Sequence, residues 1–151
     1  MSRKTTLVLA ILLLSSCSRL DALTPELLES AQSKWIASKP ESYRLVIEMK
    51  GDRVEKEQFE VIVRGGRMET LHRNGSAVAP RSGQDYSMDG LFHMLRQELD
   101  LAGNPTLLGA PAGYSAYTMA RFDEQSGRLM EYRRTVGGTA NSIEIRVLEY
   151  Q

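Results

Sequence analysis

Residues 87–103 read SMDGLFHMLRQELDLAG, and this stretch decides the fold that we predict. Ser87 is a good N-cap, and the apolar residues after it recur at the i, i+3, i+4, i+7 spacing of a helix with one buried face. Gly103 and Pro105 follow where such a helix is expected to end. The face to be buried consists of Met88, Leu91, Phe92, Leu95, Leu99 and Ala102. The stretch therefore predicts an amphipathic helix that covers a hydrophobic core.

Another helix and two strands are predicted earlier in the chain. The helix is expected over about 25–37, and Thr24 is its N-cap. Trp35 lies at the apolar spacing of this helix, so we predict it in the core or at its edge, with a ligand-stacking role as the alternative. Apolar and polar residues then alternate over 43–50 and 58–64, which predicts two paired strands with one face in the core.

A two-residue glycine turn at 65–66 leads into a third strand. The turn is expected to place Val63 opposite Met68. Strict alternation then continues the inner face of the sheet at Thr70 and His72. The first half of the chain is therefore predicted to be a helix followed by a three-strand meander.

Residues 74–86 are rich in Gly, Ser, Pro and Ala, which predicts a long surface loop before the central helix. Beyond that helix, three more strands are predicted at 115–122, 129–136 and 142–150. The second half thus repeats the first. We predict an α+β fold, with a single domain over 24–151 made of two helix-plus-three-strand halves. Its six-stranded antiparallel sheet carries both helices on one face.

The N-terminus has the build of a bacterial lipoprotein signal. Two basic residues precede an apolar run that is too short to span a bilayer as a helix. The run closes on Leu-Ser-Ser-Cys at 14–17, which resembles the lipobox. We predict a signal peptide over 1–16, lipidation of Cys17 by diacylglycerol and an N-acyl chain such as palmitate, and a tether over 17–23. An ordinary secretory signal with an unrelated cysteine is the alternative.

Location follows from the same segment. Three acyl chains exceed what stable anchoring needs, so the product is expected to stay on the membrane of the cell envelope. Ser18 stands where the inner-membrane retention signal of Gram-negative lipoproteins has Asp, which favours the outer membrane, facing the periplasm.

Charge and cysteine content exclude several classes of protein. The 19 Lys and Arg residues match the 19 Asp and Glu residues, and two of the basic residues lie in the signal peptide, so no basic excess is left for nucleic acid. Cys17 is the only cysteine. Once it is lipidated, no thiol remains for disulfides, catalysis or metal binding.

Short motifs in a fixed order carry a resemblance to a family. They are Trp35 with Pro40 and Ser42-Tyr43, Val61-x-Val63-x-Gly65-x3-Glu69, Met88-Asp89-Gly90-Leu91-Phe92, and Phe122-Asp123 before Gly127. Together they resemble an uncharacterised family of small bacterial secreted proteins and lipoproteins, over most of the mature chain. Members of that family often carry Cys-x-Cys in the first hairpin and Gly-Tyr-Pro after the Asp. This chain has no Cys there and reads Gly127-Arg128-Leu129. The resemblance implies location and fold, and no known activity.

Candidate catalytic residues are few. The only histidines are His72 and His93, and His93 with Gln97 on one helix face lacks the Glu of a zinc-peptidase helix. We interpret His93 as a solvated residue and His72 as a strand-end residue. Asp89 is the acid of most interest because it lies in the first helical turn beside Gly90, where its ordinary role is interaction with the helix dipole. The sequence predicts no metal and no cofactor.

The outer face of the predicted sheet is a candidate binding surface. If the inner face holds Phe59, Val61, Val63, Ile143, Ile145 and Val147, alternation sends a second apolar set outward. This set is Val46, Ile62, Leu71, Tyr117, Met119, Leu148 and Tyr150, among Arg44, Arg121, Arg133 and Arg146. Tyr, Met and Arg are enriched in interface cores, and the face is too apolar for plain solvent. The expected binding residues are Tyr117, Met119, Arg121, Arg133, Arg146 and Leu148. The alternative is that the sheet curls or that loop 74–86 covers the face.

Two functional hypotheses follow. The first is a non-catalytic envelope lipoprotein that contacts the membrane through its lipid and binds a protein or small ligand, with an envelope protein as the candidate partner and no nucleic acid. The second is a hydrolase of unrecognised type that uses Asp89 and one of the two histidines. An enzyme requires a histidine within hydrogen-bond reach of a carboxylate in a pocket.

Overall fold

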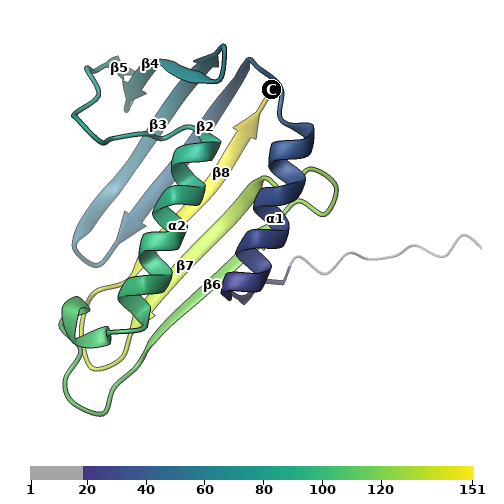
Figure 1. Ribbon diagram of the computed structural model, residues 1–151. Coiled ribbons are helices and arrows are strands. Elements are labelled where there is room, and N and C mark those ends of the chain that lie inside the picture. The colour runs from purple at the N-terminus through teal and green to yellow at the C-terminus, as the bar shows by residue number, and fades with distance from the viewer. Residues whose placement is uncertain (1–18) are drawn as a thin grey trace, which may run out of the picture.

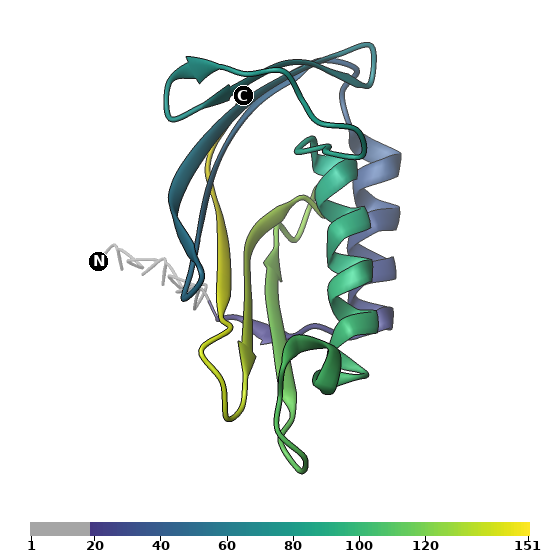
Figure 2. The same ribbon diagram turned by 90° about the vertical axis from the view of Figure 1, so that its left-hand side faces the viewer.

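The computed structural model describes residues 19–151, so the predicted signal peptide at 1–16 and the lipidation site Cys17 lie outside the described residues. Eight antiparallel strands form one sheet in the order β1-β6-β7-β8-β2-β3-β4-β5 (Figure 1). The elements in chain order are β1 (Asp21–Ala22), α1 (Pro25–Ser38), β2 (Tyr43–Gly51), β3 (Val54–Arg64), β4 (Arg67–Arg73), β5 (Ser76–Ala77), α2 (Met88–Ala102), the 3-10 helix η1 (Pro105–Leu108), β6 (Ala116–Phe122), β7 (Leu129–Val136) and β8 (Ile143–Tyr150). Both helices lie against one face of the sheet, which curves around them (Figure 2).

The prediction of six strands in two three-strand halves is wrong. Two short strands, β1 and β5, extend the sheet at its two ends. β1 precedes α1 in the chain and pairs with β6, while β5 forms within the predicted surface loop and pairs with β4. A two-residue strand shows no period-2 alternation, so the pattern that located the six longer strands could not indicate these two.

The register between β3 and β4 contains a bulge. Val63 is opposite Met68 as predicted, but the register then shifts, so that Val61 is opposite Leu71 and Ile62 is opposite Thr70. Leu71 is therefore buried in the core. The expectation that Thr70 and His72 continue the inner face is wrong, because one extra residue in β4 exchanges the two faces beyond it.

A second bulge lies in β8. Ile47 pairs with Val147, but the next pairs, Val46 with Glu149 and Leu45 with Tyr150, omit Leu148. The extra residue turns Tyr150 to the inner face. The prediction that Leu71 and Tyr150 lie on the outer face is therefore wrong.

The core lies between the helices and the concave face of the sheet. Trp35 is buried, which confirms its predicted place in the core. Its ring meets Tyr43 and Tyr150 edge-on, at centroid distances of 5.5 and 6.1 Å. Tyr43 accepts a hydrogen bond from the amide of Met88 at 2.9 Å, and burial raises the pKa of Tyr43 to about 12. The aromatic cluster thus joins α1, the start of α2 and the centre of the sheet.

Both helices start at the predicted caps. Thr24 Oγ1 accepts from the Leu27 amide at 3.2 Å, and Ser87 Oγ accepts from the Gly90 amide at 3.2 Å. Gly103 follows the last residue of α2 with right-handed backbone angles, φ −67° and ψ −18°, so the left-handed glycine of a common C-cap is not what ends this helix.

The β6–β7 turn is fastened to α1. Asp123 Oδ1 accepts from both the amide and the hydroxyl of Ser126 at 2.8 Å, and Lys34 Nζ donates to the Glu124 carbonyl at 3.0 Å. Gly127 has a φ of +73°, and a Cβ added there would lie 2.1 Å from the Ala31 carbonyl oxygen. The turn therefore needs glycine both for its backbone angle and for its close approach to the helix.

Candidate functional site

The outer face of the sheet, which points away from the helices, exposes three large apolar side chains. Tyr117 on β6 is 63% exposed, Met119 on β6 is 37% exposed, and Leu148 at the β8 bulge is 47% exposed. Val46 shares this face but is buried. The predicted apolar surface thus keeps Tyr117, Met119 and Leu148, and loses Leu71 and Tyr150 to the core.

Three of the four arginines predicted for this face form ion pairs with Glu131 and Glu144, both within a strand and between neighbouring strands. Arg121 and Arg133 both lie 3.5 Å from Glu131, and Arg133 also lies 3.4 Å from Glu144. Arg146 lies 2.5 Å from Glu144 and 3.6 Å from Glu131. The pattern extends onto β2 and β3 through Lys50–Glu144 and Lys56–Glu48. We call this set, Arg121, Arg133, Arg146, Lys50, Lys56, Glu131, Glu144 and Glu48, the charged ladder.

The acidic and basic side chains of the charged ladder differ in how far they are exposed to solvent. The acidic side chains are only 13–15% exposed, whereas the basic ones are 31–68% exposed. Five basic residues also face three acidic ones. Arg and Lys hold their aliphatic stems against the sheet while their charged ends reach outward. Within the charged ladder the basic ends are therefore outermost and the carboxylates lie beneath them, whereas Glu60 and Glu149 beside it are 36% and 53% exposed.

Two carboxylates of this face, those of Glu48 and Glu60, are held in their ionised form. The hydrogen bond from Lys56 lowers the pKa of Glu48. Beside the charged ladder, Arg44 bridges Glu60 and Glu149 at 2.7 and 2.6 Å, and its hydrogen bond lowers the pKa of Glu60. The pairing therefore keeps Glu48 and Glu60 charged at neutral pH.

The chain enters the fold at the edge of this face. β1 pairs with β6, with Asp21 opposite Ala120 and Ala22 opposite Met119. Cys17 is four residues before Asp21, so the covalent chain limits their separation to about 14 Å.

Residues of the described part also line two hollows, of which the larger shares Arg121 with the outer face. The larger, of about 970 Å³, runs between α1 and the β6–β7 turn, and its charged lining is balanced between Arg19, Lys34, Arg121 and Asp21, Asp123, Glu124. The smaller, of about 380 Å³, lies beside β4 and β5. Neither contains a histidine, and their mixed linings do not indicate one kind of ligand.

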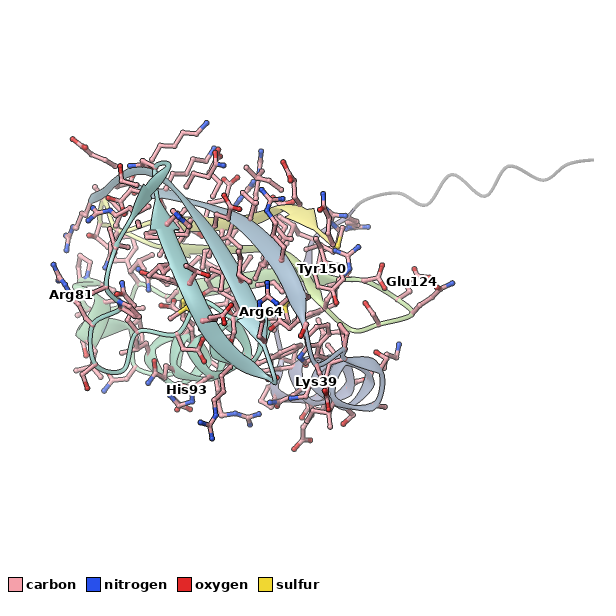
Figure 3. The ribbon with its side chains drawn as sticks, turned by 90° about the horizontal axis from the view of Figure 1, so that it is seen from above. Lys39, Arg64, Arg81, His93, Glu124 and Tyr150 are labelled. Atoms are coloured by element: carbon pink, nitrogen blue, oxygen red, sulfur yellow. The ribbon has the colours of Figure 1, made fainter. Side chains whose placement is uncertain are left out.

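The candidate catalytic residues are not brought together. Asp89 accepts from the Trp35 indole at 2.9 Å and from Lys39 Nζ at 2.8 Å. His93 is exposed on the helix side of the molecule (Figure 3), 3.2 Å from Gln97 Nε2, and His72 faces Glu60 on the other side of the sheet. Within residues 19–151, no hydrogen bond joins Asp89 to either histidine, and no group of three or more His, Cys, Asp or Glu is placed to hold a metal. No observation on this part of the chain favours the hydrolase hypothesis.

One buried polar cluster was missed by the sequence analysis. Arg134 lies on the inner face of β7 and is 7% exposed, and its Nη1 donates to both carboxylate oxygens of Glu98 on α2, at 2.7 and 2.9 Å. Tyr132 donates to the same carboxylate at 2.8 Å, and burial together with this negative charge raises the pKa of Tyr132. Arg134 Nη2 also donates to Asn141. A basic residue at an inward strand position was the available signal, but its partner on the helix could not be read from the sequence.

Comparison with known proteins adds no relative. No protein-family model matches the chain, and no curated protein sequence is similar to it. The resemblance to a family of small secreted proteins and lipoproteins therefore stays a prediction. None of the helices within residues 19–151 has the length and apolar character needed to cross a bilayer.

Proposed function

We propose that this protein is a lipid-anchored protein of the bacterial envelope, and that its single domain acts by binding a component of the envelope through the outer face of the sheet. Cys17 carries the lipid in this proposal. Ser18 after it favours the outer membrane, on the periplasmic side. The domain has no catalytic role, and nucleic acid is not its partner.

The exposed Tyr117 and Met119 beside the charged ladder are the observation that carries the proposal. Both residues lie on β6, whose edge receives the chain four residues after Cys17. Interfaces are enriched in Tyr, Met and Arg, and this face combines all three. Leu148 adds a third exposed apolar side chain on β8. The binding residues of the proposal are Tyr117, Met119, Arg121, Arg133, Arg146 and Leu148.

Metabolic labelling with a fatty acid tests the anchor. The wild-type chain should take up label and be processed, whereas Cys17→Ala should do neither, because the lipobox cysteine is both the acylated residue and the cleavage point. Equal labelling and normal cleavage of Cys17→Ala would overturn the lipid-anchored part of the proposal.

Crosslinking in intact envelopes tests the binding surface. The double substitution Tyr117→Ser and Met119→Ser should lose crosslinks while the melting temperature stays unchanged. Ile36→Ser with Leu107→Ser is the matched control, because these two exposed apolar residues lie outside the sheet, on α1 and η1. Crosslinks that survive the first pair and disappear with the second would place the binding surface on the helix side.

A further inference from the structure

We infer that the outer face of the sheet lies on an anionic phospholipid surface, and that the bilayer itself is the component this face binds. The inference rests on the proposed function, because it takes the lipid on Cys17 as the point of attachment. It adds an orientation: the sheet faces the membrane, and both helices face away from it.

The tether limits which surfaces can reach the bilayer. At most about 14 Å of chain separates Cys17 from Asp21, and Asp21 and Ala22 are hydrogen-bonded strand residues beside Ala120 and Met119. The side of the domain next to β6 is therefore held at the membrane surface. The far end of the sheet, at β5, is seven strands away from this attachment.

Charge selects the outer face over the helix face. The charged ladder has five basic and three acidic residues, and the count becomes six to five when Arg44, Glu60 and Glu149 beside it are included, so the outer face has a small basic excess. The two helices have the opposite balance, with two basic residues, Lys34 and Arg96, against five acidic ones, of which Glu98 is paired with Arg134 and Asp89 with Lys39. The acidic residues are Glu26, Glu29, Asp89, Glu98 and Asp100. An anionic surface would attract the outer face and repel the helices.

The side chains on the outer face suit the headgroup layer of a bilayer. Arg121, Arg133 and Arg146 point guanidinium groups outward, and guanidinium binds phosphate oxygens in a bidentate manner. Tyr117 has an apolar ring with a polar tip, the build of side chains that favour a membrane interface. Met119 next to it adds apolar area where the chain comes closest to its anchor.

A protein partner explains these features less completely. It would account for the exposed Tyr and Met, but it gives no reason for the basic ends of Arg121 and Arg133 to lie near the edge where the tether enters. A partly apolar face with outward basic side chains, next to a lipid attachment, is what an anionic bilayer surface complements.

Hydroxyl-radical footprinting on vesicles tests the orientation. The processed protein, beginning at Cys17, is coupled through this sole cysteine to a maleimide lipid in phosphatidylcholine vesicles, with or without phosphatidylglycerol. On vesicles with phosphatidylglycerol, oxidation of Tyr117 and Met119 should slow several-fold. Tyr114, a comparably exposed tyrosine in the connection before β6, should keep its rate. High ionic strength should remove the protection, because salt screens attraction between exposed charges.

Variants of the basic residues sharpen the test. Lys56→Ser with Arg146→Ser should reduce the protection of Tyr117, whereas Arg96→Ser on α2 should not. Melting temperatures identify any variant that fails to fold, and the salt dependence of the wild-type protein decides the question without a variant.

Two results would overturn the inference. One is equal oxidation of Tyr117 and Met119 on neutral and anionic vesicles, and the other is protection that appears only when envelope proteins are added, which would make a protein the partner. Because the lipid is attached chemically, neither result depends on acylation in the cell. Failure of the fatty-acid labelling would instead remove the anchor of the proposed function, while the vesicle measurement would still report whether the outer face binds anionic lipid.

Discussion

The indole Nε1 of Trp35 donates a 2.9 Å hydrogen bond to Oδ1 of Asp89, and this contact joins the two helices. Trp35 is buried, and Lys39 Nζ reaches the other oxygen of the same carboxylate at 2.8 Å. The two residues that the sequence offered for ligand stacking and for acid chemistry are thus partners of each other. Their joint role is to fix α1 against the start of α2.

Removing the Asp89 carboxylate is expected to destabilise the domain. Asp89→Ala should cost about 1 to 3 kcal/mol, because the buried indole N–H loses its acceptor. Asp89→Asn should cost less, since its amide oxygen can still accept from Trp35 and only the ion pair with Lys39 is lost. Urea unfolding measures both, with the exposed Asp100→Ala as the matched control on the same helix. Equal losses for Asp89→Ala and Asp100→Ala would contradict the role of this bond.

Phe92 and His93 are neighbours on α2 with opposite surroundings. Phe92 is buried and stacks on Phe122 at a centroid distance of 5.8 Å, whereas His93 is exposed. Phe92→Ala should lose about 3 to 5 kcal/mol of unfolding free energy, and His93→Ala should change it by no more than about 0.5 kcal/mol. Denaturant melts compare the two. Similar losses would mean that α2 is rotated from the orientation described.

Gly127 should tolerate a methyl group much less than Gly65. Both have positive φ, +73° and +56°, so an alanine at either position carries the strain of a left-handed backbone, about 1 to 2 kcal/mol. At Gly127 the added Cβ would collide with the carbonyl oxygen of Ala31. At Gly65 no atom lies within 4 Å of the added Cβ. Thermal melts should therefore show the larger loss for Gly127→Ala. A pair of equal losses would mean that the turn is not packed against α1.

Asp123 should make part of the stability depend on pH. The hydrogen bonds from the Ser126 amide and hydroxyl lower the pKa of this carboxyl below its ordinary value of 3.8. Because the pKa in the folded state is the lower one, the stabilisation is present above the unfolded-state value and is lost as pH falls through the folded-state value. The difference in unfolding free energy between the wild type and Asp123→Asn should thus become smaller at acidic pH. Unfolding followed at a series of pH values measures this difference, and a difference independent of pH would contradict the assignment.

The long elements of this fold were readable from the sequence. The central helix and the strand over 129–136 have a strong period and clear boundaries, and the structure places them where the pattern did. Such a period arises when one face of a helix or strand is buried and the other is exposed. Elements of this kind can therefore be recognised in the sequence. The short strands β1 and β5 leave no such trace, and they made the predicted strand count wrong.

The bulges could not be read from the sequence because a bulge changes the register without changing the composition. Leu71 and Tyr150 are apolar on either face, and only the pairing with Val61 and Leu45 shows that they point inward. The candidate surface was affected in the same way. The exposed Tyr117 and Met119 follow from simple alternation, but the acidic partners Glu131 and Glu144 depend on which strands are neighbours.

The place of β8 in the sheet also sets the order in which the chain can fold. β8 lies at the centre, between β7 and β2, and its Tyr150 pairs with Leu45 near the other end of the sequence. A chain that emerges N-terminus first can form the β2–β4 meander, but the central pair must wait for the last residues. Until then the meander has open edges and an uncovered apolar face. The sheet can therefore close only after its C-terminal strand has been made.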